Sequence, residues 1–283
     1  AIWVGTFADG GIRIAPDGQL RHFDQVQRLS SGNVRALVQD RDGVIWAGTQ
    51  GGLLRIDGEQ VSRADTAGLP QELVTALGEH QGQLWVGSTE GVRIVGKDRV
   101  QRLPLNEMGG ARSVFGLQAV GQAMWICTDR GLYRWRGGEL THVGLEHGLP
   151  VDTVFQLVPD RIGNVWISSN RGVLRTDMAS LNEVADGQRR QLDVELYNEI
   201  DGMANAQANG TSGPAAMLRS DGSYWVVTAG GLSTVDPLRL RRFREHLPPP
   251  PMLENVLVDG VPINFHAQSG QLGGGSRLTV SYI

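Results

Sequence analysis

One stretch of the chain gathers side chains suited to binding a polar ligand. Between residues 181 and 215 an aromatic ring, amides and a carboxylate follow one another at short intervals. Such groups suit a small polar ligand, for example a carbohydrate. The alternative is that they hydrogen-bond the loop to itself, which is an ordinary use of Asn and Asp in irregular backbone. The candidate ligand-binding residues are Tyr197, Asn198, Asp201, Asn205 and Asn209.

Two other groups resemble metal sites. His142, Glu146 and His147 share one loop and could bind a metal, although a solvated loop explains them as well. The run from Asp40 to Gly43 imitates part of a calcium loop. Similar Asp-to-Gly runs recur elsewhere in the chain, so a hairpin turn is the better interpretation. We therefore expect neither a metal nor a cofactor.

The sequence contains no recognisable catalytic signature. There is no Gly-x-Ser-x-Gly motif, no His-Glu-x-x-His motif and no phosphate-binding glycine loop. The single cysteine, Cys127, excludes an intramolecular disulfide and a cysteine-based zinc site. A net charge of −4 disfavours a nucleic-acid surface. We interpret the cluster of arginines at 239–244 as a solvated strand next to a linker.

The elements that must position these residues come from an internal repeat. Six segments share a Trp between apolar residues, and the intervals between the Trp residues are 43, 39, 40, 41 and 59. In five of the segments a Gly follows six residues after the Trp. Each unit reads as four short strands separated by Gly-rich turns, which is typical of a β-propeller blade. The repeated residues, which we expect to fill the space between blades, are Trp3, Trp46, Trp85, Trp125, Trp166 and Trp225.

The expected fold class is all-β, with about six visible blades of four antiparallel strands. The first unit lacks its inner strand, so either the C-terminal segment completes it or the ring has seven blades with more sequence upstream. Residues 1–244 are predicted to form the propeller. Residues 245–251, with four consecutive prolines, form a linker. Residues 252–283 are expected to begin a β-sandwich that is incomplete.

The repeat resembles that of a known family. The run from Asp40 to Leu53 and the run from Asp160 to Trp166 are similar to the two-component regulator propeller repeat. Gly-Leu-Pro at 68–70 and 148–150 is also similar to a motif that recurs in that family. The segment from residue 248 to the end is similar to the start of the Ig-like triple-tyrosine domain that follows such propellers.

The resemblance implies a sensory role. Propellers of this family form the extracytoplasmic, periplasmic sensor region of membrane-bound histidine kinases, hybrid kinases or diguanylate cyclases. It implies a downstream transmembrane helix as the one link to the membrane, and a homodimeric parent protein. The chain itself is then expected to be non-catalytic and to bind no nucleic acid.

Two alternatives stay open. One is a propeller enzyme of lyase or lactonase type, similar to the streptogramin lyases, which would need His or carboxylate side chains converging on the central channel. The other is a protein-binding scaffold of WD-repeat type, but the Gly-His and Trp-Asp pairs of that family do not recur in this sequence.

Overall fold

The computed structural model describes residues 1–23, 32–64, 68–69, 71–96, 99–245, 253–262 and 278–282. Contacts divide the chain into two units, Ala1–Pro237 and Leu238–Ile283, and each is described by itself. The first unit therefore ends before residue 244. Apart from Glu245, the predicted linker lies outside the described residues.

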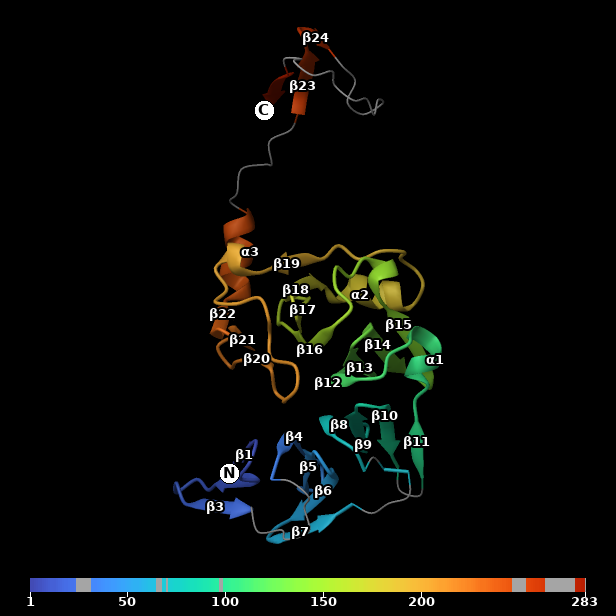
Figure 1. Cartoon of the computed structure of the whole chain (residues 1–283), viewed down its shortest axis with the longest axis vertical. Helices are drawn as coiled ribbons and strands as arrows, with labels where there is room; N and C mark the ends of the chain where they lie inside the picture. Colours follow the sequence, from blue (N-terminus) through green and yellow to red (C-terminus); the bar gives the residue numbers. More distant parts are fainter. Residues whose placement is uncertain are drawn as a thin grey trace. The chain divides into compact units, whose positions relative to one another are not determined.

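The first unit is a β-propeller of six antiparallel sheets within the described residues (Figure 1), as predicted. Blades 2 to 5 have four strands each, whereas blades 1 and 6 have three. The strands of blades 1 to 3 are β1 (Ile2–Gly5), β2 (Gly11–Ile14), β3 (Leu20–Phe23), β4 (Val34–Gln39), β5 (Ile45–Thr49), β6 (Gly52–Asp57), β7 (Gln60–Arg63), β8 (Val74–His80), β9 (Gln83–Ser88), β10 (Gly91–Val95) and β11 (Val100–Arg102).

The later blades contain longer connections. Their strands are β12 (Val114–Val120), β13 (Ala123–Thr128), β14 (Gly131–Arg136), β15 (Glu139–Val143), β16 (Val154–Pro159), β17 (Asn164–Ser169), β18 (Gly172–Asp177), β19 (Glu195–Tyr197), β20 (Ala216–Leu218), β21 (Tyr224–Thr228) and β22 (Gly231–Val235). The connections of this unit contain the helical segments α1 (Leu105–Gly109), η1 (Leu145–His147), α2 (Met178–Ala185) and η2 (Glu199–Asp201).

The first strands of successive blades lie around a common centre (Figure 1). Contacts join β4 to β8, β8 to β12, β12 to β16 and β16 to β20. The second strand of each blade, which contains the repeated Trp, pairs with the first strand in blades 2 to 6. In blade 1 the Trp strand, β1, is the edge of the sheet.

Side-chain hydrogen bonds at the turns explain why the repeat spacing is so regular. The Thr or Ser that ends the Trp strand donates to the carbonyl of the Gly that begins the third strand, at 2.8 Å for Thr49 and Gly52. At the other end of the strand, Asp40 Oδ1 accepts from the Val44 amide and Asp40 Oδ2 accepts from Trp46 Nε1 at 2.7 Å. Asp40 therefore organises a hairpin turn, as the sequence indicated.

The Gly two residues after the Trp permits close packing between blades. A Cβ on Gly48 would lie 2.5 Å from Val74 Cγ1, and a Cβ on Gly87 would lie 2.6 Å from Val114 Cγ1. Both valines begin the first strand of the next blade. Cys127 occupies the same position in blade 4 and is fully buried in one cluster with Val154.

The Trp residues of blades 1 to 5 pack against residues of the following blade, but the burial differs along the ring. Trp85, Trp125 and Trp166 are 0–1% exposed, whereas the other three of the six are half-buried. Burying about 150–250 Å² per Trp contributes roughly 4–6 kcal/mol before the cost in conformational entropy. The Trp residues of blades 3 to 5 therefore form the centre of the core.

The second unit contains α3 (Pro237–Glu245), which begins at the last residue of the first unit, and a three-stranded sheet. Its strands β23 (Leu253–Val258), β24 (Val261–Pro262) and β25 (Leu278–Tyr282) pair in the order β24-β23-β25. The prediction of a strand at the arginine cluster is wrong, because residues 239–244 lie in α3. Proline is well tolerated in the first turn of a helix, where its missing N–H has no partner to lose.

Candidate functional site

The loops that connect successive blades meet at one face of the propeller. The start of each first strand pairs with the end of the second strand of the same blade, as Val34 does with Thr49 and Val154 with Ser169. The connections between blades and the hairpins between second and third strands therefore share this face, which we call the loop face. The connection from β19 to β20, residues 198–215, is on the loop face and contains four of the predicted ligand-binding residues.

Three of the predicted residues lie where this connection begins. The hydroxyl of Tyr197 donates to Glu195 Oε2 at 2.6 Å, and its ring lies 5.8 Å from the Trp166 ring. Asn198 Oδ1 accepts from the Ile200 amide, and Asp201 Oδ2 accepts from the Asn198 amide at 3.0 Å. These two side chains cap the short helix η2.

The other two predicted residues lie further along the same connection. Asn205 Oδ1 accepts from the Gln207 amide at 2.8 Å. The backbone amide of Asn209 donates to the Val227 carbonyl, and the residue is exposed. Several of the predicted polar groups thus hydrogen-bond within the segment, while Asn209 faces solvent.

The tip of the connection reaches across to blade 2. Arg35 Nη1 lies 3.3 Å from Ser212 Oγ and 3.4 Å from the Thr211 carbonyl, and the Gly213 amide donates to the Arg35 carbonyl at 2.9 Å. The Arg35 guanidinium carbon lies 4.8 Å from the centre of the Phe7 ring. Arg35 therefore ties blades 1 and 2 to the connection that precedes blade 6.

An aromatic pair lies under the same connection. The rings of Phe115 and Phe155 are 5.3 Å apart in an edge-to-face arrangement. A Cβ on Gly210 would lie 2.1 Å from Phe155 Cδ1, so only glycine fits against this ring. The segment around Gly210 thus crosses the starts of the first strands, beside a cation and two aromatic rings.

Sequence reasoning did not select Arg35, Phe115 or Phe155. The signal was available, because each is the second residue of a first strand and follows a repeated Val at 34, 114 or 154. The fourth strand of this set has Thr75 at that position. The Val at the start of the strand is the same in four blades, which indicates a packing position. The residue after it differs from blade to blade, which indicates a position that packing leaves free to vary.

Two hollows open on this face. One, of about 100 Å³, is lined by residues 5–7 at the end of β1, by residues 33–37, and by Ser212 and Gly213. The other, of about 230 Å³, is lined by Thr89–Gly91 and by residues from Arg102 to Arg112. Both have polar and apolar walls, which suits a small polar molecule better than a large apolar one.

The histidine loop makes local contacts. His142 Nδ1 and His147 Nδ1 each lie 3.2 Å from Glu146 Oε1, and His142 Nε2 lies 2.6 Å from the Arg130 carbonyl. Among the residues that the structure describes, no group of three or more His, Cys, Asp or Glu side chains is arranged to hold a metal ion.

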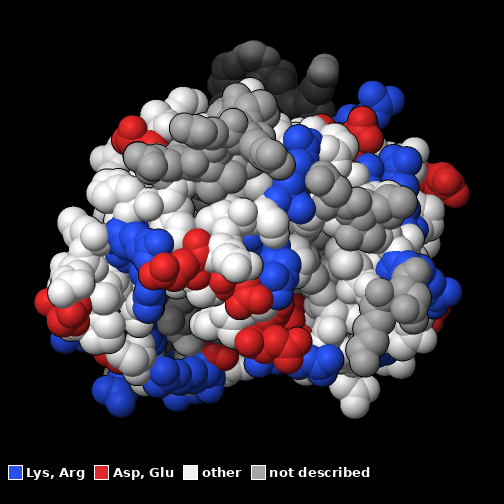
Figure 2. All heavy atoms as spheres, turned by 90° about the horizontal axis from the view of Figure 1, so that it is seen from below, with Lys and Arg blue, Asp and Glu red and all other residues white. Residues whose placement is uncertain are grey.

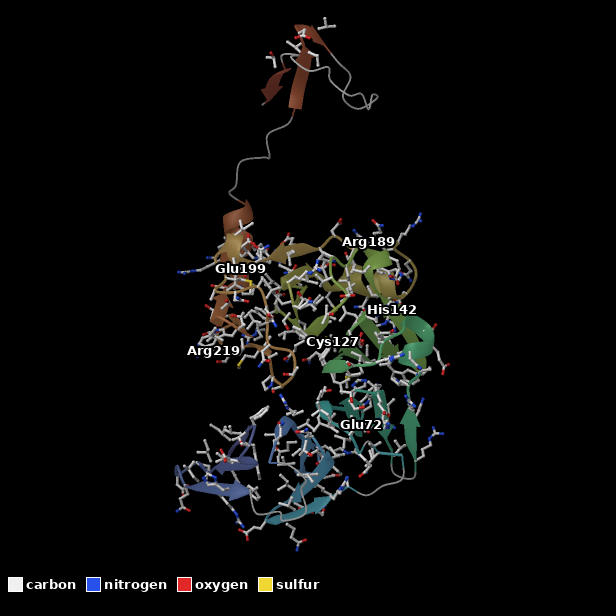
Figure 3. The ribbon with its side chains drawn as sticks, viewed as in Figure 1. Glu72, Cys127, His142, Arg189, Glu199 and Arg219 are labelled. Carbon is white, nitrogen blue, oxygen red and sulfur yellow. The ribbon has the colours of Figure 1, made fainter. Side chains whose placement is uncertain are left out.

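Two buried titratable groups favour the neutral form. Burial raises the pKa of the Cys127 thiol and that of the Tyr224 hydroxyl well above their ordinary values. Figure 3 places Cys127 inside the propeller and Arg219 at its margin. A thiol held neutral in this way is a poor nucleophile.

Charges are mixed over the surface. In Figure 2 basic and acidic side chains are interspersed over the visible face, and neither sign forms a broad continuous area among the described residues. Searching the described residues for a helix long and apolar enough to cross a membrane finds none.

Residues 28–51 match the family described as two component regulator propeller. The matched segment includes strands β4 and β5 of blade 2. The match includes Asp40 and Trp46, whose hydrogen bond organises the first hairpin of blade 2.

Among known proteins, the chain is similar to "Histidine kinase P4" of Formosa agariphila, with 21% identity over 215 residues that make up 69% of this chain and 15% of that protein. Among solved structures, it is similar to the extracellular domain of the putative hybrid two component system BT3049 from B. thetaiotaomicron, with a TM-score of 0.72 and 18% identity. That match covers 99% of this chain and 36% of the other. The chain thus spans a small part of these relatives.

The fold is shared more widely. Virginiamycin B lyase from Staphylococcus aureus matches with a TM-score of 0.60 and 13% identity, over 82% of this chain and 79% of the lyase. At this identity the likeness concerns the fold alone.

Proposed function

We propose that the chain is the extracytoplasmic sensor module of a bacterial signal-transduction protein, is itself non-catalytic, and binds a small polar ligand on the loop face. The repeat match over residues 28–51 supports the family assignment. The similarity to a histidine kinase and to the extracellular domain of a hybrid two-component system supports the signalling role and the periplasmic location.

The observation that carries the ligand proposal is the position of residues 198–215. This connection is on the loop face and contacts Arg35 of a distant blade, so a ligand bound to it would lie at a junction between separate parts of the ring. Rigid blades that position variable loops are a common arrangement for binding sites. Amide, hydroxyl and guanidinium groups beside aromatic rings suit a carbohydrate.

Signalling requires that the ligand favour one arrangement of the parent protein over another. A ligand shifts an equilibrium only by the difference in its affinity for the two states. We propose that the parent is a homodimer linked to the membrane by a downstream helix, and that the ligand changes the relative arrangement of its subunits.

A thermal-shift screen of the purified chain against oligosaccharides tests this proposal. A ligand should raise the Tm progressively with its concentration. The substitution Asn209→Ala should weaken binding by about tenfold while leaving the Tm of the free chain unchanged, since the residue is exposed. Gln122→Ala, in an exposed turn at the opposite face, is the matched control. Equal loss of binding in both variants, or in neither, would contradict the assigned site.

A second candidate function is that of a propeller lyase or lactonase, since virginiamycin B lyase has a similar fold. Turnover assays on cyclic depsipeptides and lactones, with and without added divalent cations, separate it from the first. Product formation by the purified chain that is abolished by a chelator would support the enzyme.

A further inference from the structure

A hollow of about 230 Å³ lies on the loop face where blade 3 meets the connection to blade 4. It is lined by the β9–β10 hairpin, by the end of β11, by the start of α1 and by the residues just before β12. Leu103, Leu105 and Ala111 are 1–2% exposed and form an apolar wall. Both blades have four strands, so the hollow belongs to the regular part of the ring.

Two exposed arginines line the hollow. Arg102 is the last residue of β11, and Arg112 lies two residues before β12. The acidic residues of the adjoining hairpins have partners of their own. Glu90 Oε2 lies 3.6 Å from Nη2 of Arg93, and Asp129 Oδ1 accepts from the Arg112 backbone amide at 3.0 Å. The lining thus contains two cations and one carboxylate, and that carboxylate is directed toward Arg93.

The junction between blades 2 and 3 shows what accompanies such an arginine elsewhere. Arg63 of β7 has the same register as Arg102, and each donates to a backbone carbonyl in the hairpin after its blade's Trp strand, at 3.0 Å and 3.1 Å. Arg63 also donates to the side-chain oxygen of Gln71, three residues before the first strand of the next blade. The residue at that position before β12 is Ala111, which offers no side-chain acceptor.

The junction between blades 4 and 5 is closed by an ion pair at the equivalent position. Asp152 lies two residues before β16, and its Oδ2 is 3.2 Å from Nη1 of Arg130 in the hairpin of blade 4. The amide of Gly131 in the same hairpin donates to the Asp152 carbonyl. Two residues before β12 the chain has Arg112, so a cation occupies the position of this carboxylate. The connection before blade 4 therefore lacks both of the acceptor side chains that its neighbours supply.

We propose that this hollow binds the carboxylate of a small polar ligand, either an organic acid or an acidic sugar. A guanidinium donates two parallel hydrogen bonds to a carboxylate, which makes arginine well suited to this group. The ligand carboxylate takes the place between hairpin and connection that the side chain of Asp152 takes at the next junction. The apolar wall packs against the carbon skeleton of the ligand. The described lining includes none of residues 198–215, so this site does not depend on the ligand proposed there.

Calorimetric titration of the purified chain with succinate and with glucuronate tests the proposal, each beside a neutral counterpart, succinamide and glucose. We expect at least one carboxylate to bind with a Kd below about 1 mM, and at least about tenfold more tightly than its neutral counterpart. The affinity should fall as NaCl is raised from about 0.05 M to about 0.5 M, because salt screens exposed charges. Binding of succinate alone assigns the site to organic acids, and binding of glucuronate alone assigns it to acidic sugars.

Arg112→Gln should weaken binding of the carboxylate by about tenfold or more while leaving the Tm of the free chain unchanged, since the residue is exposed. Arg171→Gln removes the same charge from an exposed position in the β17–β18 hairpin on the same face and is the matched control. Equal weakening by the two substitutions, or no binding of either carboxylate, would overturn the proposal. Inorganic phosphate that binds more tightly than both carboxylates would also overturn it and assign the hollow to a phosphate group. Because both substitutions lie outside residues 198–215, failure of this test leaves the ligand proposed there unaffected.

Discussion

Blades 3 to 5 and the two end blades use the same repeat but differ in burial. Trp85, Trp125 and Trp166 are almost inaccessible, while Trp3 and Trp225 are half-buried. The side chains flanking the Trp differ in the same way, since Ile126 of blade 4 is fully buried and Val4 of blade 1 is 39% exposed. The repeat motif alone therefore does not fix the burial of the Trp ring, and even Trp46, whose blade has a neighbour on either side, is half-buried.

The comparison also explains the stability of the unit. Each blade contacts the blades on either side, so the stability of such an array is approximately a sum of blade terms and interface terms. Among the described residues, the strand contacts of blade 1 are with blade 2 and those of blade 6 are with blade 5. Equivalent substitutions in central and end blades should therefore change the stability or the accessibility of the site by different amounts. Three pairs of substitutions, each with one member in a central blade and one in blade 6, test this.

The largest difference should come from the Trp residues. Trp125→Ala should lower the free energy of unfolding by about 3–5 kcal/mol, because it removes a fully buried ring from the core. Trp225→Ala should cost about 1 kcal/mol, since the ring is half-buried and its main contacts are Ser223 and the Arg219 guanidinium. Urea denaturation followed by circular dichroism measures both. Equal costs would contradict the role of the neighbouring blade.

A smaller difference should come from two aspartates. The hydrogen bond from Arg134, whose side chain is 3% exposed, holds the pKa of Asp186 below its usual range. A depressed pKa in the folded state contributes stability above the ordinary carboxyl value of about 3.9, and this is lost as the pH falls through the folded-state pKa. Asp186→Asn should therefore cost up to about 1 kcal/mol at pH 6, because Asp186 is itself exposed and solvent screens the pair, and the gap to the parent should close from about pH 4 downward.

Asp221 is the matched aspartate in blade 6. Its hydrogen bonds to Ser223 lower its pKa, but it lies in an exposed turn. Asp221→Asn should have a much smaller effect on urea unfolding between pH 2 and pH 7. A pH-independent gap for Asp186→Asn would mean that the Arg134 contact does not act through the charge of Asp186.

The pair of positions that should change stability least is compared by thiol labelling. Cys127 is fully buried and should react with a thiol reagent only when blade 4 opens. Val227 occupies the same position in blade 6 and is 41% exposed. In a Cys127→Ser background, V227C should react at least a hundredfold faster than the natural thiol, with a change in Tm of no more than about 2 °C. Similar labelling rates would show that the end blade is as well covered as the centre.

The sequence predicted the blades because their turns are local. Asp40 and Trp46 are six residues apart, and Thr49 and Gly52 are three residues apart, so the spacing marks both turns, and the structure adds the hydrogen bonds that hold them. The sequence showed that a Gly recurs two residues after the Trp. The structure was needed to show why, namely that a Val of the next blade approaches it closely.

The candidate site was less predictable. The five polar residues from Tyr197 to Asn209 were selected by composition from the insertion at 181–215, and their role in binding stays a prediction. Arg35 and Thr211 are 176 residues apart, and no local pattern links them. Helix α3 was missed because the alternation of Leu and Arg at its start also suits a strand, and the short helix α2 lies in an insertion outside the repeat.

The hydrogen bond between Trp46 and Asp40 has a consequence for how such proteins gain blades in evolution. Both partners lie within one blade, as do Trp166 and Asp160. Duplication of a DNA segment about forty codons long therefore copies both partners of the hydrogen bond together. It also copies the Gly two residues after the Trp, against which the Val of the next blade packs. Gene duplication can in this way add whole blades without first requiring a compensating change elsewhere in the chain.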